Sequence, residues 1–137
     1  TGVDISAKQI ELARANVPTG DFVCADMTEI ALADAAFEGI VSFYAIIHVP
    51  REEHAALFGK IARWLKPRGS ALLVLGASDW EGTEDNWIGA GATMYWSQFD
   101  VETNAALLRG AGLRLSESAI VPDRLGGAHW FVLVEAA

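Results

Sequence analysis

The sequence predicts an α/β fold built on an open, twisted, mostly parallel sheet with helices on both faces. Short apolar runs alternate with segments whose apolar residues recur at three- and four-residue spacing, the pattern of strands that alternate with helices. The last two apolar runs, 113–121 and 129–134, are joined by a short loop rich in turn residues, so they should pair as antiparallel neighbours. A chain of 137 residues can bury the core of one such domain.

The chain opens with the features of a strand, a helix and a second strand. Residues 2–5 are expected to be the end of a strand. Ser6 and Gln9 have the spacing of a capping box, in which the two side chains bind the first free backbone N–H groups, so a helix should begin there. The apolar run 22–25 should form a short strand that ends at Asp26.

The middle of the chain predicts two further strands with a helix between them. Residues 39–47 are apolar on both faces, as in a central strand covered from both sides. Pro50 can open a helix, because its missing N–H costs nothing in the first turn. Residues 66–69 should end that helix, and residues 70–76 should form the next strand.

From residue 77 to residue 97 the periodicity is lost, and aromatic side chains stand among Gly, Asp, Glu and Thr. A segment of this length without regular structure is typically a functional loop or lid. Asp100 can cap a third helix, which Gly112 should close.

Composition excludes several classes of protein. A formal net charge of -8 disfavours nucleic acid and anionic membranes as partners. The uninterrupted apolar runs, such as Ala71–Leu75, are far shorter than the ~20 residues of a membrane span. The single cysteine, Cys24, permits neither a disulfide nor a zinc framework, so we expect no metal and a small core residue. No signal peptide is recognised, and we expect a cytoplasmic protein.

Four segments, in this order and spacing, resemble the class I S-adenosylmethionine-dependent methyltransferases along essentially the whole chain. They are Gly2-Val3-Asp4-Ile5-Ser6, Ala25-Asp26-Met27, the stretch from Phe37 to Gly69, and Leu107 to Leu113. The resemblance implies a Rossmann-like sheet with strand order 3-2-1-4-5-7-6, S-adenosylmethionine as cofactor, and methyl transfer to a small molecule.

The sequence also departs from the family pattern. Arg68 stands where the family commonly has the first glycine of a pair, and Gly39 replaces the usual aspartate. The family's first strand, glycine-rich turn and first helix have no counterpart before residues 2–5, and residue 1 is threonine rather than methionine. We therefore expect residues 1–137 to be a single, incomplete methyltransferase domain without its N-terminal cofactor-binding segment.

The resemblance assigns cofactor contacts to Asp4, Ile5, Asp26, Met27, Phe43 and Tyr44. A carboxylate at the end of a strand can accept hydrogen bonds from both ribose hydroxyls, which is the role expected of Asp4. The alternative is that Asp4 interacts with the N-terminus of the following helix. Asp26 and Met27 would border the adenine, and the alternatives are an Asx-turn and core packing.

Two residues could accept a proton from the substrate. His48 is the better candidate, because imidazole titrates near pH 6.5, and Tyr44 is the other. A structural role for His48 is the alternative. In the expected lid, Trp80, Trp87, Tyr95 and Trp96 could form an apolar pocket for a flat or lipophilic substrate, or anchor the loop to the sheet.

The missing central strand would leave two apolar strand edges exposed, so we expect self-association, a swapped dimer, or pairing with a separate N-terminal fragment. Two other functions remain open from the sequence. One is a non-catalytic methyltransferase-like partner subunit. The other is a nicotinamide-dependent oxidoreductase, whose fold also places an acid at the end of its second strand.

Overall fold

A computed structural model describes all residues from Thr1 to Ala137. The chain forms two compact units, Thr1–Leu32 and Ala33–Ala137. None of the helices combines the length and the apolar composition that a membrane span requires.

The first unit consists of two parallel strands and one helix. Strand β1 (Gly2–Asp4) and strand β2 (Phe22–Cys24) pair in parallel, with Asp4 opposite Cys24. Helix α1 (Ala7–Asn16) connects them. The hydroxyl of Ser6 accepts a hydrogen bond from the backbone N–H of Gln9 at 3.4 Å, so the predicted N-cap is confirmed.

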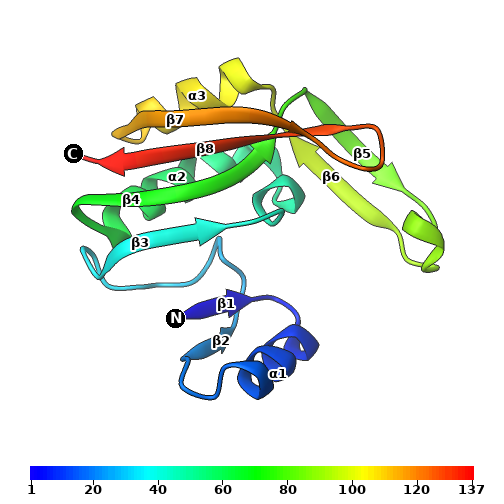
Figure 1. Ribbon diagram of the computed structural model, residues 1–137, viewed down its shortest axis with the longest axis horizontal. Helices are drawn as coiled ribbons and strands as arrows, with labels where there is room; N and C mark the ends of the chain where they lie inside the picture. The colour runs from blue at the N-terminus through cyan, green and yellow to red at the C-terminus, as the bar shows by residue number, and fades with distance from the viewer. The chain divides into compact units, whose positions relative to one another are not determined.

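The second unit contains a four-stranded mixed sheet in the order β3-β4-β8-β7 (Figure 1). Strand β3 (Phe37–Ser42) runs parallel to β4 (Leu65–Gly76). Strand β8 (Ala128–Ala136) is antiparallel to both β4 and β7 (Leu113–Pro122). The α/β class and the antiparallel C-terminal pair are thus confirmed. The strand pairs are divided between parallel and antiparallel rather than mostly parallel.

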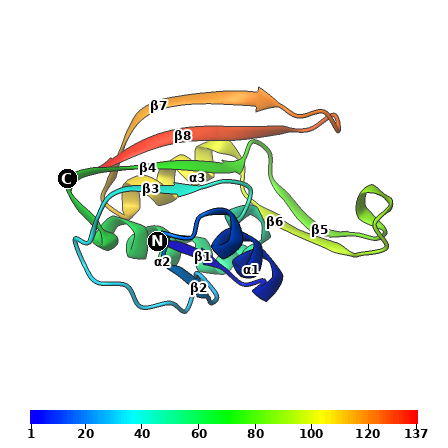
Figure 2. The same cartoon turned by 60° about the horizontal axis from the view of Figure 1, so that its bottom comes forward.

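Two helices cover one face of this sheet. Helix α2 (His54–Trp64) follows a 3-10 turn, Arg51–Glu53, so Pro50 opens that turn and the α-helix begins later than predicted. Helix α3 (Val101–Gly110) begins at Asp100, whose side chain accepts a hydrogen bond from the N–H of Thr103 as predicted. Both helices contact β4 and each other, and they lie on the same side of the sheet (Figures 1 and 2).

The core lies between these helices and the sheet. Buried residues alternate with less buried ones along β8, because successive side chains of a strand point to opposite faces. Strand β4 is buried on both faces at its C-terminal end, Leu73–Gly76. The fully buried side chains include Leu57, Phe58, Leu73, Leu75, Leu108, Val132 and Val134. The sheet and α2 thereby fix the carboxyl ends of β3 and β4, which lie at the same edge because the strands are parallel.

The segment predicted to be an irregular lid is a β-hairpin with a short helical tip. Strand β5 (Trp80–Glu84) pairs antiparallel with β6 (Met94–Gln98), and a 3-10 turn, Trp87–Gly89, lies between them. Glu81 and Thr83 share one face, and Gly82 occupies the other. This two-residue alternation was masked in the sequence by glycine and acidic residues, which strands normally disfavour.

The predicted strand 39–47 is wrong at its C-terminal half. Strand β3 ends at Ser42, and Ile46–His48 form a 3-10 turn. Tyr44 has a φ of 54°, in the left-handed region, so the chain turns there instead of continuing as a strand. Ile46 and Ile47 are nevertheless buried, which is why the apolar pattern continues past the end of the strand.

Strand β4 begins earlier than predicted, because Leu65 pairs with Phe37 before the ladder resumes at Ser70 opposite Gly39. Between these pairs the register shifts, and Arg68 adopts a φ of 64°. Lys66 forms an ion pair with Glu38 across this bulge. The lysine holds the pKa of the Glu38 carboxyl below its usual value, chiefly by its hydrogen bond to that group.

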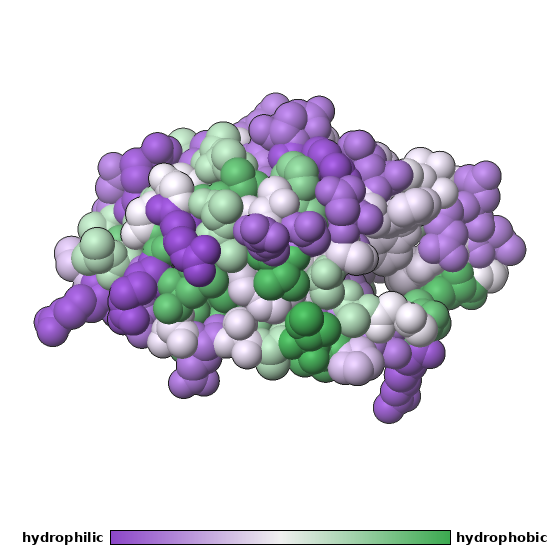
Figure 3. All heavy atoms as spheres, turned by 90° about the horizontal axis from the view of Figure 1, so that it is seen from above, coloured by the Kyte–Doolittle hydropathy of each residue, from purple (hydrophilic) through white to green (hydrophobic).

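Several apolar side chains remain at the surface. Viewed from above, hydrophobic residues appear between hydrophilic ones (Figure 3). Val41 of β3 and Ile120 of β7 are both more than half exposed. Cys24 is also exposed, and its thiol donates to the carbonyl oxygen of Ile5 at 3.5 Å, so the expectation of a core cysteine is wrong.

Candidate active site

Two acidic residues follow the neighbouring parallel strands of the first unit. Asp4 is the last residue of β1 and lies opposite Cys24, and Asp26 follows two residues later. The backbone N–H of Ala25 donates to the carbonyl oxygen of Asp4 at 3.1 Å, which holds the two strand ends together. Both acids therefore leave the same edge of this small sheet, the edge at which parallel α/β sheets bind ligands.

The Asp4 side chain is exposed and makes one contact with the turn that precedes α1. Its Oδ1 accepts a hydrogen bond from the N–H of Ser6 at 2.7 Å. A carboxylate offers about four lone-pair sites on two oxygens, so this single bond leaves capacity for a diol. The local role and the predicted ribose role of Asp4 are therefore compatible.

The Asp26 side chain is half-buried and forms an Asx-turn. Its Oδ1 accepts hydrogen bonds from the N–H and the hydroxyl of Thr28, at 2.8 and 2.9 Å. Met27 between them is half-buried, while Ile5 after β1 is 72% exposed. An apolar side chain this exposed beside Asp4 offers a surface on which a flat ring could pack.

In the second unit, the segment after β3 carries Phe43 and Tyr44, which are both about half exposed. The ring of Tyr44 meets the ring of His129 edge to face, with centroids 5.0 Å apart. It also lies 6.2 Å from the ring of Phe131. Tyr44 is thus held at the carboxyl end of β3 by aromatic contacts with β8.

His48 is fixed by contacts with the hairpin. Its Nδ1 lies 2.7 Å from the carbonyl oxygen of Tyr95. A carbonyl oxygen can only accept, so Nδ1 carries the proton and Nε2 of the neutral ring carries the lone pair. The ring also packs against Trp96, with centroids 4.8 Å apart. These contacts support a structural role, and the same tautomer leaves Nε2 able to accept a proton.

The four predicted substrate-binding aromatics are divided between the two faces of the hairpin. Trp96 lies opposite Gly82 and contacts Trp87, with ring centroids 6.1 Å apart. Trp80 is on the same face as Trp96, because it is two residues from Gly82. Tyr95 faces the other way and its hydroxyl donates to Glu81 at 3.2 Å. Trp87 and Trp96 therefore form a cluster with His48, and Tyr95 belongs to a polar face.

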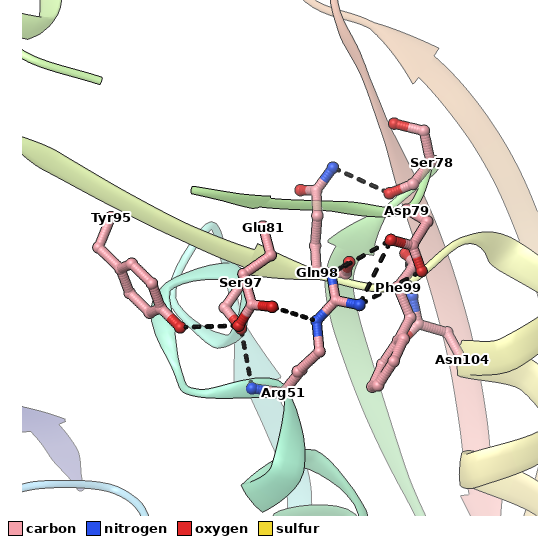
Figure 4. Close-up of polar contacts among 9 residues, drawn as sticks. All are labelled: Arg51, Ser78, Asp79, Glu81, Tyr95, Ser97, Gln98, Phe99 and Asn104. Atoms are coloured by element: carbon pink, nitrogen blue, oxygen red, sulfur yellow. Dashed lines mark hydrogen bonds and ion pairs between the residues drawn. The ribbon is translucent and has the colours of Figure 1, made fainter. Parts of the chain in front are cut away.

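A polar network around Arg51 connects the start of α2 to the base of the hairpin (Figure 4). Its guanidinium lies within 3.3 Å of an oxygen of Asp79 and donates to the carbonyl oxygen of Gln98 at 2.9 Å. Its Nε lies 3.6 Å from Glu81. The backbone N–H of Arg51 donates to the hydroxyl of Ser97 at 2.8 Å. Four separate contacts thus fix one residue of the 3-10 turn to both hairpin strands.

Arg51 and His129 were not expected from the sequence as residues at the carboxyl ends of the strands or at the base of the hairpin. An arginine directly after Pro50 is a signal for a helix start, but its partners lie about thirty residues or more away along the chain. His129 lies in the last strand, where its proximity to Tyr44 depends on the pairing of β4 with β8. Tertiary structure, rather than a sequence motif, brings Arg51 and His129 each to its own partners.

The chain matches known proteins over most of its length. A family model described as a methyltransferase domain matches residues 1–69, half of the chain. An O-methyltransferase from Pyrenophora dematioidea is 39% identical over 80 residues. That match covers 54% of this chain and 29% of the relative, so the chain spans less than a third of the relative's length.

Solved structures show the same fold. A SAM-dependent methyltransferase from Methanosarcina mazei has a TM-score of 0.80 at 16% identity, over 98% of this chain and 80% of that protein. An N1-methyltransferase from Burkholderia thailandensis, solved with S-adenosylhomocysteine and 1,6-didemethyltoxoflavin, has a TM-score of 0.70 at 24% identity, over 97% and 58% of the two chains. The family match includes Asp4 and Asp26. The chain therefore belongs to the class I S-adenosylmethionine-dependent methyltransferase family.

Proposed function

We propose that this chain serves methyl transfer from S-adenosylmethionine to a small-molecule acceptor. The observation that carries the proposal is the pair of acids, Asp4 and Asp26, at the ends of in-register parallel strands within the segment that the family model matches. The acidic chain also favours a small acceptor over nucleic acid, because a net charge of -8 repels phosphates.

The acidic and apolar side chains at the strand ends of the first unit fit a nucleoside. Asp4 would accept hydrogen bonds from the ribose hydroxyls, each worth roughly 1.5–3 kcal/mol because the acceptor is charged. Ile5 and Met27 would pack on the adenine, and Asp26 would border it. In the second unit, Phe43 and Tyr44 would border the cofactor, as the family resemblance implies.

When bound, the cofactor supplies an electrophilic methyl group on a positively charged sulfur. The protein's own contribution is alignment and exclusion of water, and alignment alone is worth up to ~7–11 kcal/mol in favourable cases. Tyr44 and His48, the two proton acceptors expected from the sequence, would lie beside the acceptor and position it. Trp80, Trp87, Tyr95 and Trp96 would provide its apolar surface, with Trp87 and Trp96 already in contact.

The match to an O-methyltransferase supports an oxygen atom as the methyl acceptor. The comparisons give no support to the two alternatives from the sequence, a non-catalytic partner subunit and a nicotinamide-dependent oxidoreductase. Binding of S-adenosylhomocysteine separates all three.

The test is isothermal titration of the whole chain with S-adenosylhomocysteine and, separately, with NAD. We expect saturable binding of S-adenosylhomocysteine and none of NAD. Binding of NAD alone would favour the oxidoreductase. Binding of neither, even when the chain is joined to a glycine-rich N-terminal segment, would favour the partner subunit. Either result would contradict the proposal.

The proposal includes self-association through strand edges. Strand β3 is the terminal strand of its sheet and β1 has β2 as its one neighbour, so each presents a row of backbone groups that can pair with another chain. Val41 in β3 is 66% exposed. We expect the chain to elute as a dimer or larger species in size-exclusion chromatography with light scattering.

A charge on β3 should weaken this association. Val41→Lys should shift the chain toward the monomer, because lysine on an edge strand opposes further pairing. Leu12→Lys, on the exposed surface of α1, is the matched control and should leave the mass unchanged. A wild-type monomer at every concentration would rule out this part of the proposal.

A further inference from the structure

His129 lies at the edge of the sheet at which open α/β folds bind their ligands. It pairs with Gly76, the last residue of β4, and with Val121 of β7. The turn between β7 and β8 lies beyond the end of β4 (Figure 1). Because β3 runs parallel to β4, the segment that carries Tyr44 ends at the same edge, and the ring contact of 5.0 Å confirms that the two side chains meet.

The turn after β7 holds a carboxylate against His129. Asp123 Oδ1 accepts hydrogen bonds from the N–H groups of Leu125 and Gly127, at 2.7 and 3.1 Å. Its other oxygen, Oδ2, lies 3.6 Å from Nδ1 of His129. The turn is closed by a bond from the Asp123 N–H to the carbonyl oxygen of Gly127 at 3.0 Å. Hydrogen bonds within its own turn therefore fix the Asp123 carboxylate, independently of its contact with the His129 ring.

This arrangement selects one tautomer of the ring. Nδ1 is buried and has no hydrogen-bond partner, while a negative oxygen faces it. A proton on Nδ1 is favoured by that charge, which leaves the lone pair on Nε2. The His129 side chain is 13% exposed, so the ring is mostly buried but still reaches the surface beside the exposed Tyr44.

We propose that His129, oriented by Asp123, accepts the proton of a hydroxyl-bearing methyl acceptor. The inference rests on the proposed methyl transfer and names the acceptor as a phenol or a similarly acidic hydroxyl. The acceptor oxygen forms a bond to the methyl carbon, the bond from that carbon to sulfur breaks, and its electron pair stays on sulfur. The hydroxyl proton passes to Nε2. One positive charge thus moves from sulfur to the imidazolium, which Asp123 stabilises.

The charges around His129 agree with such a role. Burial lowers the pKa of the ring, Asp123 opposes that shift, and His48 adds to it. The imidazole is therefore neutral at pH 7 and able to accept a proton. Hydrogen bonds from Gly127 and Leu125 hold the pKa of Asp123 below its usual value, so it stays ionised. Tyr44 is the other titratable group in contact with the ring.

The pairing of His129 with Asp123 can be tested without cofactor or acceptor. The chain has three histidines, so their side-chain NMR signals can be assigned from single variants and followed with pH. We expect the Nδ1–H tautomer for His129 and a further downward pKa shift in Asp123→Asn, which removes the charge that favours the imidazolium. His54, buried elsewhere, should not respond. An unchanged pKa of His129 in Asp123→Asn would overturn the pairing of His129 with Asp123.

Gly127→Ala supplies a second variant that leaves the acid in place. A Cβ at this position would lie 2.7 Å from Asp123 Oδ2, so the carboxylate must shift from the position in which it faces Nδ1 of the ring. We expect the same downward pKa shift as in Asp123→Asn. Gly110→Ala, whose Cβ would meet nothing within 4 Å, is the matched control and should behave as the wild type.

Methyl transfer to two phenols tests the catalytic role. His129→Gln should slow transfer to phenol by about 10²–10⁴-fold, and far less to 4-nitrophenol, which is largely ionised at slightly alkaline pH and needs no base. It should also abolish the acidic limb of the kcat/KM pH profile. Equal losses for both phenols would overturn the role of His129 as base.

Two further outcomes separate this inference from the proposed function. A chain that binds S-adenosylhomocysteine but methylates neither phenol would overturn the inference and leave the proposed function intact. A chain that does not bind S-adenosylhomocysteine would overturn both, whatever the NMR titration shows about the pairing of His129 with Asp123.

Discussion

The guanidinium of Arg51 lies over the ring of Phe99, with its central carbon 4.7 Å from the ring centroid. Phe99 directly follows β6, so this cation–π contact joins the 3-10 turn before α2 to the end of the hairpin. Together with the bonds to Asp79 and Gln98, it makes Arg51 the residue that fixes the base of the hairpin.

Arg51→Met should therefore loosen the hairpin more than the rest of the chain. We expect a loss of about 1–3 kcal/mol, because two carboxylates and a carbonyl oxygen lose a charged partner. Hydrogen exchange followed by mass spectrometry should show faster exchange in β5 and β6 and unchanged exchange in α1. Lys8→Ala, which breaks an exposed pair with Glu11, is the control and should cost less than about 0.5 kcal/mol. Uniformly faster exchange would contradict a local role.

Arg68→Gly should stabilise the chain. Arg68 has a φ of 64°, which costs a residue with a Cβ roughly 1–2 kcal/mol but costs glycine nothing. Part of that gain is lost because glycine is more flexible in the unfolded state, so we expect a net gain of about 0.5–1 kcal/mol in urea unfolding. Arg68→Ala keeps the Cβ and should give no gain. Equal stabilisation by both substitutions would show that the side chain, and not the backbone, is the source.

Stability should fall as the pH drops from 7.5 to 5. Burial lowers the pKa of His54 in the folded state, and this effect outweighs the hydrogen bond from Nε2 to the carbonyl oxygen of Val49 at 3.0 Å, which raises the pKa. Below about pH 6.5 the unfolded chain binds a proton that folded His54 does not, so protonation favours unfolding. This group contributes at most about 1.4 kcal/mol per pH unit.

The measurement is the free energy of unfolding in urea at both pH values. His129 contributes in the same direction, since its pKa is also lowered. His54→Gln should therefore reduce the loss of stability between pH 7.5 and 5 without abolishing it, although the variant is less stable at both. A pH dependence identical to that of the wild type would contradict the assignment to His54.

Local signals in the sequence predicted the first unit and the C-terminal pair well. Ser6 and Asp100 cap their helices because capping depends on residues three apart. The end of β3 could not be predicted, because Ile46 and Ile47 are buried in a 3-10 turn as they would be in a strand. Backbone direction there is set by the left-handed Tyr44, which an apolar pattern does not reveal.

The candidate site was predictable where it depends on strand ends and not where it depends on tertiary pairing. Asp4 and Asp26 follow strands that could be recognised from the sequence. Asp123 meets His129 because a turn folds back between β7 and β8, and no spacing rule specifies that contact. The aromatic residues of the hairpin were identified, but their division between two faces required the register of β5 and β6.

The most direct test of the central claim is the affinity of Asp4→Asn for S-adenosylhomocysteine, measured by titration calorimetry beside the wild type. Asparagine keeps an oxygen that can accept the 2.7 Å hydrogen bond from Ser6 but loses the charge and the second acceptor. If Asp4 holds the ribose, affinity should fall by about 10- to 150-fold, equivalent to ~1.5–3 kcal/mol, while Asp21→Asn, in the loop before β2, binds as the wild type does. Equal affinity in wild type and Asp4→Asn would contradict the account.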